Sequence, residues 1–155
     1  DEALDLLEQY DMHSSANSCY HFQIADASGD TVVVEYVDNE MSVLDPDDVT
    51  TAGQPAAGTT YMAATNFLLT SGEYDFGTGQ DRYQIVIEGL GATDGVLSED
   101  EAMSLLAACS QEPHINSRGE ESQTQWSVVY NLDKQSATIA IGRDYENVYE
   151  VSLRE

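Results

Sequence analysis

Basic residues are scarce in this sequence. Its 155 residues include five Lys and Arg against 29 Asp and Glu, and Lys134 is the only lysine. The resulting formal net charge of −24 repels phosphate backbones and anionic lipid surfaces. We therefore expect neither a nucleic-acid partner nor a membrane partner.

Cysteines and long apolar runs are also lacking. Cys19 and Cys109 are too few for a disulfide framework or a metal knuckle, so we expect buried free thiols in a reducing, cytoplasmic compartment. No apolar run approaches the ~20 residues that span a bilayer, and no basic segment followed by an apolar one marks a signal peptide. The chain begins at Asp1 without a methionine, and we expect that it has lost its beginning.

What is present predicts one α+β domain covering residues 1–155. The hydrophobic share of 41% and the length suit a single globular core. Helical periodicity, turn chemistry and β-branched runs place the elements. The expected helices are 2–10, 81–90 and one that follows the capping box Ser98–Glu101, with Ala102, Leu105, Leu106 and Cys109 on its buried face. The expected strands are 20–26, 31–37, 41–44, 61–69, 125–132, 137–143 and 148–153, with loops at 45–58, 71–80 and 114–123. Strands and helices in separate blocks favour antiparallel sheets.

Ordinary catalytic constellations are thin. His13, His21 and His114 are scattered, without the helical i, i+4 spacing of a zinc site. Cys19 and His21 fall on the same face of a predicted strand, which suits either a thiolate–imidazole pair or two neighbours in a core. We expect no cofactor and no metal site.

The acidic run at Asp45, Asp47 and Asp48 has two interpretations. Clustered carboxylates bind hard cations, but the spacing is not that of an EF-hand loop and Pro46 stiffens the run. A solvated acidic loop is the alternative.

Asn66 and Arg82 are the two candidate site residues. Asn66 interrupts an apolar strand, where its amide could donate to a developing oxyanion or simply close the strand end. Arg82 follows a Gly-rich loop, where a guanidinium could orient a carboxylate or serve as a surface counter-charge. Composition and spacing leave both alternatives open.

Five blocks of the sequence, in order, resemble the choloylglycine hydrolase and linear amide C–N hydrolase family. The blocks are HFQIAD at 21–26 with GD at 29–30 and VVEY at 33–36, TNF at 65–67, GTGQDRY at 77–83, TQWSVVYNL at 124–132 and GRDYENVY at 142–149. The resemblance covers most of the chain. It implies part of an Ntn-hydrolase αββα sandwich, in which two antiparallel sheets are flanked by helices.

The resemblance also implies an activity. In that family an N-terminal cysteine attacks the carbonyl of an N-acyl amide, such as a conjugated bile salt or penicillin V, while its own α-amino group accepts the proton. The family's asparagine, here Asn66, would stabilise the oxyanion. Its arginine, here Arg82, would lie near the thiolate and orient the substrate.

The sequence departs from this pattern at its first residue, which is Asp1 rather than cysteine. We therefore expect a C-terminal portion that is inactive alone, whose partners are the missing N-terminal segment, a small N-acyl amide substrate and, through unpaired strand edges, a second copy of the chain. The alternatives are a non-catalytic acidic α+β interaction module and a two-chain enzyme whose other chain carries the cysteine.

Overall fold

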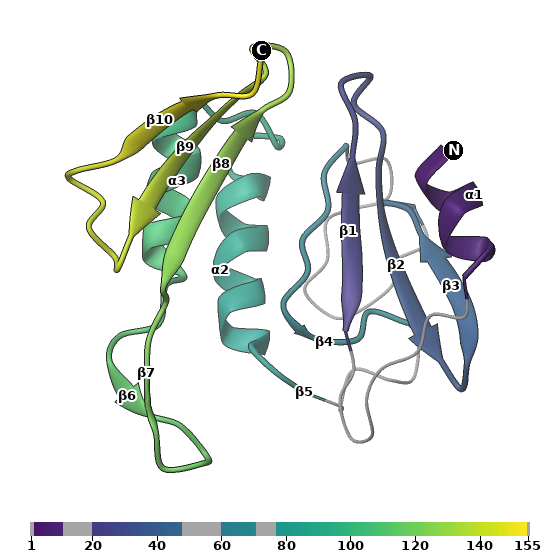
Figure 1. Cartoon of the computed structure of the whole chain (residues 1–155), viewed down its shortest axis with the longest axis horizontal. Helices are drawn as coiled ribbons and strands as arrows, with labels where there is room; N and C mark the ends of the chain where they lie inside the picture. The colour runs from purple at the N-terminus through teal and green to yellow at the C-terminus, as the bar shows by residue number, and fades with distance from the viewer. Residues whose placement is uncertain (1, 11–19, 48–59, 71–76, 155) are drawn as a thin grey trace. The chain divides into compact units, whose positions relative to one another are not determined.

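The computed structural model describes residues 2–10, 20–47, 60–70 and 77–154. Over these residues the chain is a mixed α+β protein with small antiparallel sheets and three helices (Figure 1). It divides into two compact units, Asp1–Asp81 and Arg82–Glu155, and each is described by itself. The α+β class expected from the sequence is confirmed.

The first unit contains a three-stranded meander. Strands β1 (His21–Ala25), β2 (Thr31–Val37) and β3 (Glu40–Leu44) pair antiparallel in the order β1-β2-β3, and the helix α1 (Glu2–Glu8) precedes them. Gly29 takes a φ of +97° in the β1–β2 turn, as turn chemistry requires. The β2–β3 turn is formed by Asp38 and Asn39, both with positive φ.

A short ladder completes this unit. Strand β4 (Asn66–Phe67) pairs antiparallel with β5 (Gly77–Thr78). The predicted strand over 61–69 is wrong for most of its length, because only these two residues of it find a ladder partner among the described residues. Apolar side chains on both sides of β4 are nevertheless buried with those of the sheet. The core of the unit comprises Val33, Val34, Leu44, Met62, Ala63, Phe67, Leu68 and Leu69.

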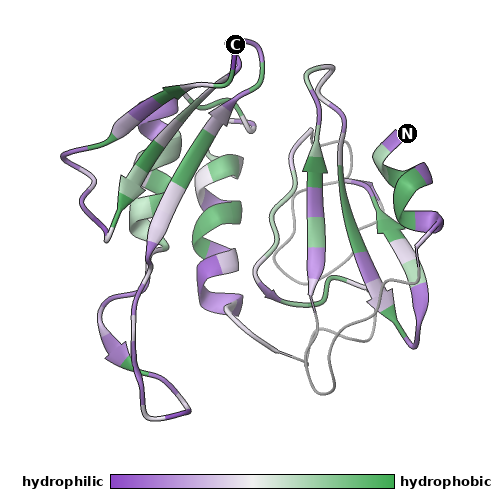
Figure 2. Ribbon diagram, in the orientation of Figure 1, coloured by the Kyte–Doolittle hydropathy of each residue, from purple (hydrophilic) through white to green (hydrophobic). Residues whose placement is uncertain are grey.

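The second unit pairs two helices with a second meander. Helix α2 (Gln80–Gly91) begins at the junction of the units, and α3 (Glu99–Ala108) follows. Strands β8 (Trp126–Asn131), β9 (Ser136–Ile141) and β10 (Tyr149–Ser152) form an antiparallel sheet with β9 at its centre. Hydrophobic colour follows much of the central strands β2 and β9 in Figure 2. The helices and strands predicted in this part of the chain are confirmed to within a few residues.

Two predictions in this unit need correction. The loop expected over 114–123 contains a small hairpin, β6 (His114–Ile115) and β7 (Glu121–Ser122), whose Gly119 has a φ of +79°. This hairpin is exposed, as expected, and largely hydrophilic in Figure 2. The side chains of α3 that were predicted to be buried are only half-buried, and the buried residue of this helix is Met103 instead.

The start of α3 is fixed by its cap and by the sheet. Ser98 Oγ accepts from the Glu101 amide, and the Glu101 carboxylate accepts from the Ser98 amide, so the predicted capping box is confirmed. Glu99 Oε1 accepts from Asn131 Nδ2 at 2.7 Å and from Lys134 Nζ at 2.5 Å. These contacts join the first turn of α3 to β8 and to the β8–β9 turn.

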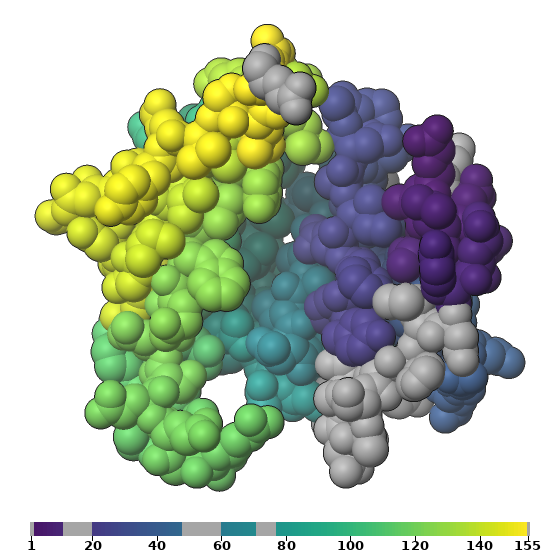
Figure 3. All heavy atoms as spheres, in the orientation of Figure 1, coloured from purple at the N-terminus to yellow at the C-terminus, as the bar shows by residue number. Residues whose placement is uncertain are grey.

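One face of the second sheet, which carries Trp126, Tyr130 and Tyr149, is apolar and exposed. The registers place Trp126 beside Ile141 and Tyr149 beside Ile139 on this face. Trp126 is 65% exposed, and Tyr130 and Tyr149 are each 63% exposed. Side chains of the C-terminal strands, drawn from green to yellow, lie at the surface in Figure 3. These apolar side chains are neighbours on one face, whereas the exposed apolar residues of monomers are ordinarily scattered singly.

Candidate functional site around Asn66

Asn66 lies in the two-residue ladder between β4 and β5. It is the register partner of Thr78, and Phe67 is the partner of Gly77. Thr65 Oγ1 donates to the carbonyl oxygen of Gly79 at 3.0 Å, which ties the residue before Asn66 to the residue that follows β5. Asn66 itself is exposed, while Phe67 is buried in the core. The ladder therefore presents an amide side chain at the surface of a fixed backbone.

Gly77 is required for this ladder. A Cβ atom at Gly77 would lie 2.0 Å from the carbonyl oxygen of Asn66 and 2.8 Å from Cα of Phe67. Both contacts are with backbone, which cannot rotate away. Gly77 also has a φ of +111°, a region that side chains disfavour. The Gly-rich segment predicted before Arg82 therefore serves close approach to the Asn66 strand; residues 71–76 of that segment lie outside the described residues.

The segment on either side of Asn66 is attached to one face of the first sheet. Gln23 Nε2, in β1, donates to the carbonyl oxygen of Met62 at 3.1 Å. At the other end, the backbone amides of Leu69 and Thr70 donate to Glu35, in β2, at 2.7 and 2.8 Å. Residues 62–70 are thus bound at both ends and paired in the middle.

Glu35 is a buried carboxylate of this site that the sequence analysis did not identify. Its side chain is 0% exposed, although it lies within the apolar run of β2. Burial raises the pKa of the Glu35 carboxyl, but the hydrogen bonds from His21, Leu69 and Thr70 together outweigh that effect, so its pKa lies below the ordinary value. The sequence carries little signal for this burial, because Val34 on the opposite face of β2 is buried as well, so the alternation of side chains does not single out Glu35.

His21 lies beside Glu35 in this site. Its Nδ1 lies 3.5 Å from Glu35 Oε1, and the two residues are opposite each other in the β1–β2 register. The alternative partner, Cys19, lies outside the described residues, as does His13. An imidazole beside a buried carboxylate supplies a partner for its charge when protonated.

Arg82 lies in the first turn of α2 and is half-buried. It falls in the second unit, whereas Asn66 falls in the first, so each is placed within its own unit. Inside the second unit, burial raises the pKa of the Cys109 thiol, and the positive charge of Arg82 acts in the opposite direction. Cys109 caps the end of α3, half-buried, and its Sγ lies 3.4 Å from the carbonyl oxygen of Leu106. A thiol with a raised pKa at a helix end is a poor nucleophile.

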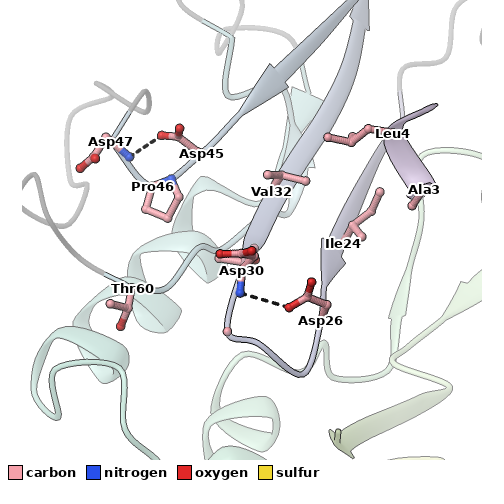
Figure 4. A pocket seen from close by; sticks show the side chains of 12 residues that line it. Ala3, Leu4, Ile24, Asp26, Asp30, Val32, Asp45, Pro46, Asp47 and Thr60 are labelled. Atoms are coloured by element: carbon pink, nitrogen blue, oxygen red, sulfur yellow. Dashed lines mark hydrogen bonds between the residues drawn. The ribbon is translucent and has the colours of Figure 1, made fainter. Parts of the chain in front are cut away.

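The predicted acidic loop lines a cavity of about 500 Å³ in the first unit (Figure 4). Its lining includes Asp26, Asp30, Asp45 and Asp47 together with apolar side chains of α1, β1 and β2. Asp48 lies outside the described residues. Asp26 and Asp45 accept hydrogen bonds from residues two to four positions away in the chain. Asp26 accepts from Ser28 and Asp30, and the Ser28 side-chain hydrogen bond is the largest cause of the lowered pKa of Asp26. In the described part of the chain, no group of three or more His, Cys, Asp or Glu residues could hold a metal ion.

Comparison with known proteins leaves the chain without an assigned family. No protein-family model matches the sequence, and no curated protein matches it. Within the described residues, the helices are all too short or too polar to cross a membrane.

Proposed function

We propose that this chain is the oxyanion-stabilising portion of a hydrolase that cleaves linear C–N amide bonds of N-acyl compounds. The observation that carries the proposal is the ladder at Asn66: a side chain that can donate hydrogen bonds lies on a strand whose partner must be glycine. A donor that stabilises a transition state must be in place before charge develops, because reorganisation would cost part of the gain. The ordered family-like blocks support the same function.

In the proposed reaction, a cysteine thiolate bonds to the amide carbonyl carbon and the carbonyl oxygen becomes an oxyanion. The side-chain amide of Asn66 donates to that oxygen. The C–N bond then breaks, the amine leaves with a proton returned by the cysteine's α-amino group, and water hydrolyses the thioester to the acid. Arg82 orients the substrate. The αββα sandwich belongs to this proposal.

The proposal requires a cysteine with a free α-amino group, and Asp1 occupies the first position of these 155 residues. Such an amino group titrates at about 7.7–8.0 and can accept a proton near neutral pH. Cys109 does not meet the requirement, since it is internal and its thiol pKa is raised.

Intact-mass measurement on the protein purified from its native source tests this requirement. A mass above 16.9 kDa with cysteine at the mature N-terminus is expected. A native protein of 16.9 kDa beginning at Asp1, with no cysteine-bearing partner in the preparation, would contradict the proposal.

Variants of that native protein test the roles of the two residues. Asn66→Ala is expected to lower kcat for amide hydrolysis by about 10²–10³-fold, the usual cost of one oxyanion donor. Arg82→Ala is expected to raise KM, and Arg118→Ala, which removes a guanidinium in the exposed β6–β7 turn, serves as the control. Equal activity of Asn66→Ala and wild type would exclude the oxyanion role.

A second candidate function is a non-catalytic interaction module. The observation that favours it is the exposed apolar face of β8, β9 and β10, with Trp126, Tyr130 and Tyr149. Aromatic side chains are enriched at the centres of protein interfaces. This candidate predicts a stable protein without amidase activity on any N-acyl amide.

A further inference from the structure

Glu35 is an unusual residue for the centre of a strand. Carboxylates are almost never fully buried unless they are paired, because the ion loses its hydration. Glu35 is 0% exposed and is among the largest fully buried side chains of the described residues, together with Val33 and Val34. Its surroundings must therefore stabilise the charge, and the groups that do so identify what the charge organises.

Those groups come mostly from the segment that follows β4. Glu35 Oε1 accepts from the Leu69 amide at 2.7 Å, and Oε2 accepts from the Thr70 amide at 2.8 Å and from Thr70 Oγ1 at 2.7 Å. His21 Nδ1 lies 3.5 Å from Oε1 on the neighbouring strand. Both carboxylate oxygens are thus engaged, and among the described residues the hydroxyl and backbone amide donors to them lie three or four residues after Asn66.

We propose that Glu35 is a positioning residue, whose buried carboxylate sets the conformation of residues 66–70 and with it the direction of the Asn66 side chain. This inference rests on the proposed function for the role of Asn66 in catalysis. The placement of the strand by Glu35 stands on the hydrogen bonds alone.

An amide in place of the carboxylate cannot do the same work. Glutamine has nearly the shape of glutamate, but one of its two terminal groups is a donor. In Glu35→Gln, either the Leu69 amide or the Thr70 amide would face an N–H group. The buried donor left without an acceptor would favour opening of the segment.

The test is made on the 155-residue chain by NMR. In Glu35→Gln we expect the Leu69 and Thr70 amide protons to move upfield and the Asn66 side-chain amide signals to shift. Hydrogen exchange over residues 66–70 should accelerate about ten- to hundredfold, the size expected for one charge-assisted hydrogen bond. Glu40→Gln, the same change at an exposed position of β3, should leave all these signals in place.

A milder variant keeps the test decisive if Glu35→Gln does not fold. Thr70→Val removes only the hydroxyl donor to Oε2 and keeps both backbone amides. It should shift the same Asn66 signals by a smaller amount. In the native enzyme it should lower kcat with little change in KM, because the oxyanion donor moves while the substrate contacts remain.

The outcomes separate the two proposals. Shifted Asn66 signals in Glu35→Gln or Thr70→Val support the positioning role, and they do so even if the native protein hydrolyses no amide, which would sink the proposed function alone. Asn66 signals that coincide with wild type in every folded variant of these two overturn the positioning role, whatever the activity.

Discussion

Replacement of Gly77 by alanine is the sharpest perturbation of the Asn66 ladder. The new Cβ would lie 2.0 Å from the Asn66 carbonyl oxygen, so β4 and β5 must separate by about 1 Å or more to reach the closest contacts that packed atoms accept. Separation weakens the ladder hydrogen bonds, each worth about 0.5–1.5 kcal/mol. The φ of +111° adds about 1–3 kcal/mol of backbone strain. We expect a total loss of about 3–5 kcal/mol in the free energy of unfolding of the first unit.

Gly29→Ala is the matched control. Gly29 has a similar φ of +97°, but nothing lies within 4 Å of a Cβ built there. Its substitution should therefore cost only the backbone strain of about 1–3 kcal/mol. The difference between the two variants isolates the contact with the Asn66 backbone.

Urea unfolding followed by circular dichroism measures both losses, and hydrogen exchange locates them. In Gly77→Ala the acceleration should concentrate in residues 62–70, whereas in Gly29→Ala it should concentrate in the β1–β2 hairpin. Equal losses of stability in the two variants, or normal protection of residues 62–70 in Gly77→Ala, would refute the claim that close backbone approach fixes the Asn66 strand.

Four further predictions address the rest of the fold. The pKa of Glu35 is lowered in the folded state, so its carboxylate contributes fully to stability at a pH above its unfolded pKa of about 4.3. That contribution disappears as the pH falls through the folded pKa. Urea midpoints measured from pH 7 to pH 3 should therefore fall more steeply for wild type than for Glu35→Gln. Tyr36→Phe should stabilise the first unit by about 1 kcal/mol, since the buried Tyr36 hydroxyl has no hydrogen-bond partner among the described residues; thermal unfolding would show this, and no gain over the exposed control Tyr130→Phe would contradict it. Ser98→Ala should cost about 0.5–2 kcal/mol through loss of the α3 cap, measured by urea unfolding, and an unchanged midpoint would count against the capping box. Raising the salt concentration from 0.05 to about 1 M should increase the urea midpoint, because the net charge of −24 repels itself; a midpoint that falls would show that ion pairs outweigh this repulsion.

Elements with a strong local signal could be predicted from the sequence. The β1–β2 hairpin, the α3 capping box and the three C-terminal strands follow from alternation, turn glycine and cap chemistry, which act over a few residues. The segment over 61–69 could not be predicted in the same way. Its apolar residues are buried by contact with the sheet, so they satisfy the hydrophobic pattern of a strand without forming a ladder along its length.

Part of the candidate site could be predicted from the sequence. Asn66 stands out because it interrupts an apolar run, but the need for Gly77 depends on which strand lies opposite, and that is a tertiary fact. Glu35 illustrates the harder case. Its burial depends on donors that are 34 and 35 residues away in the chain, and no local pattern around β2 reports their approach.

We propose that Asn66 stabilises an oxyanion in amide hydrolysis, and measuring amine release by the protein purified from its native source tests this role. The protein is incubated with a conjugated bile salt and with penicillin V, and the liberated acid and amine are quantified by mass spectrometry. We expect equimolar release of both products, blocked by alkylation of an N-terminal cysteine and reduced about 10²–10³-fold by Asn66→Ala. Product formation at the same rate by wild type and Asn66→Ala, or none at all from any N-acyl amide, would contradict it.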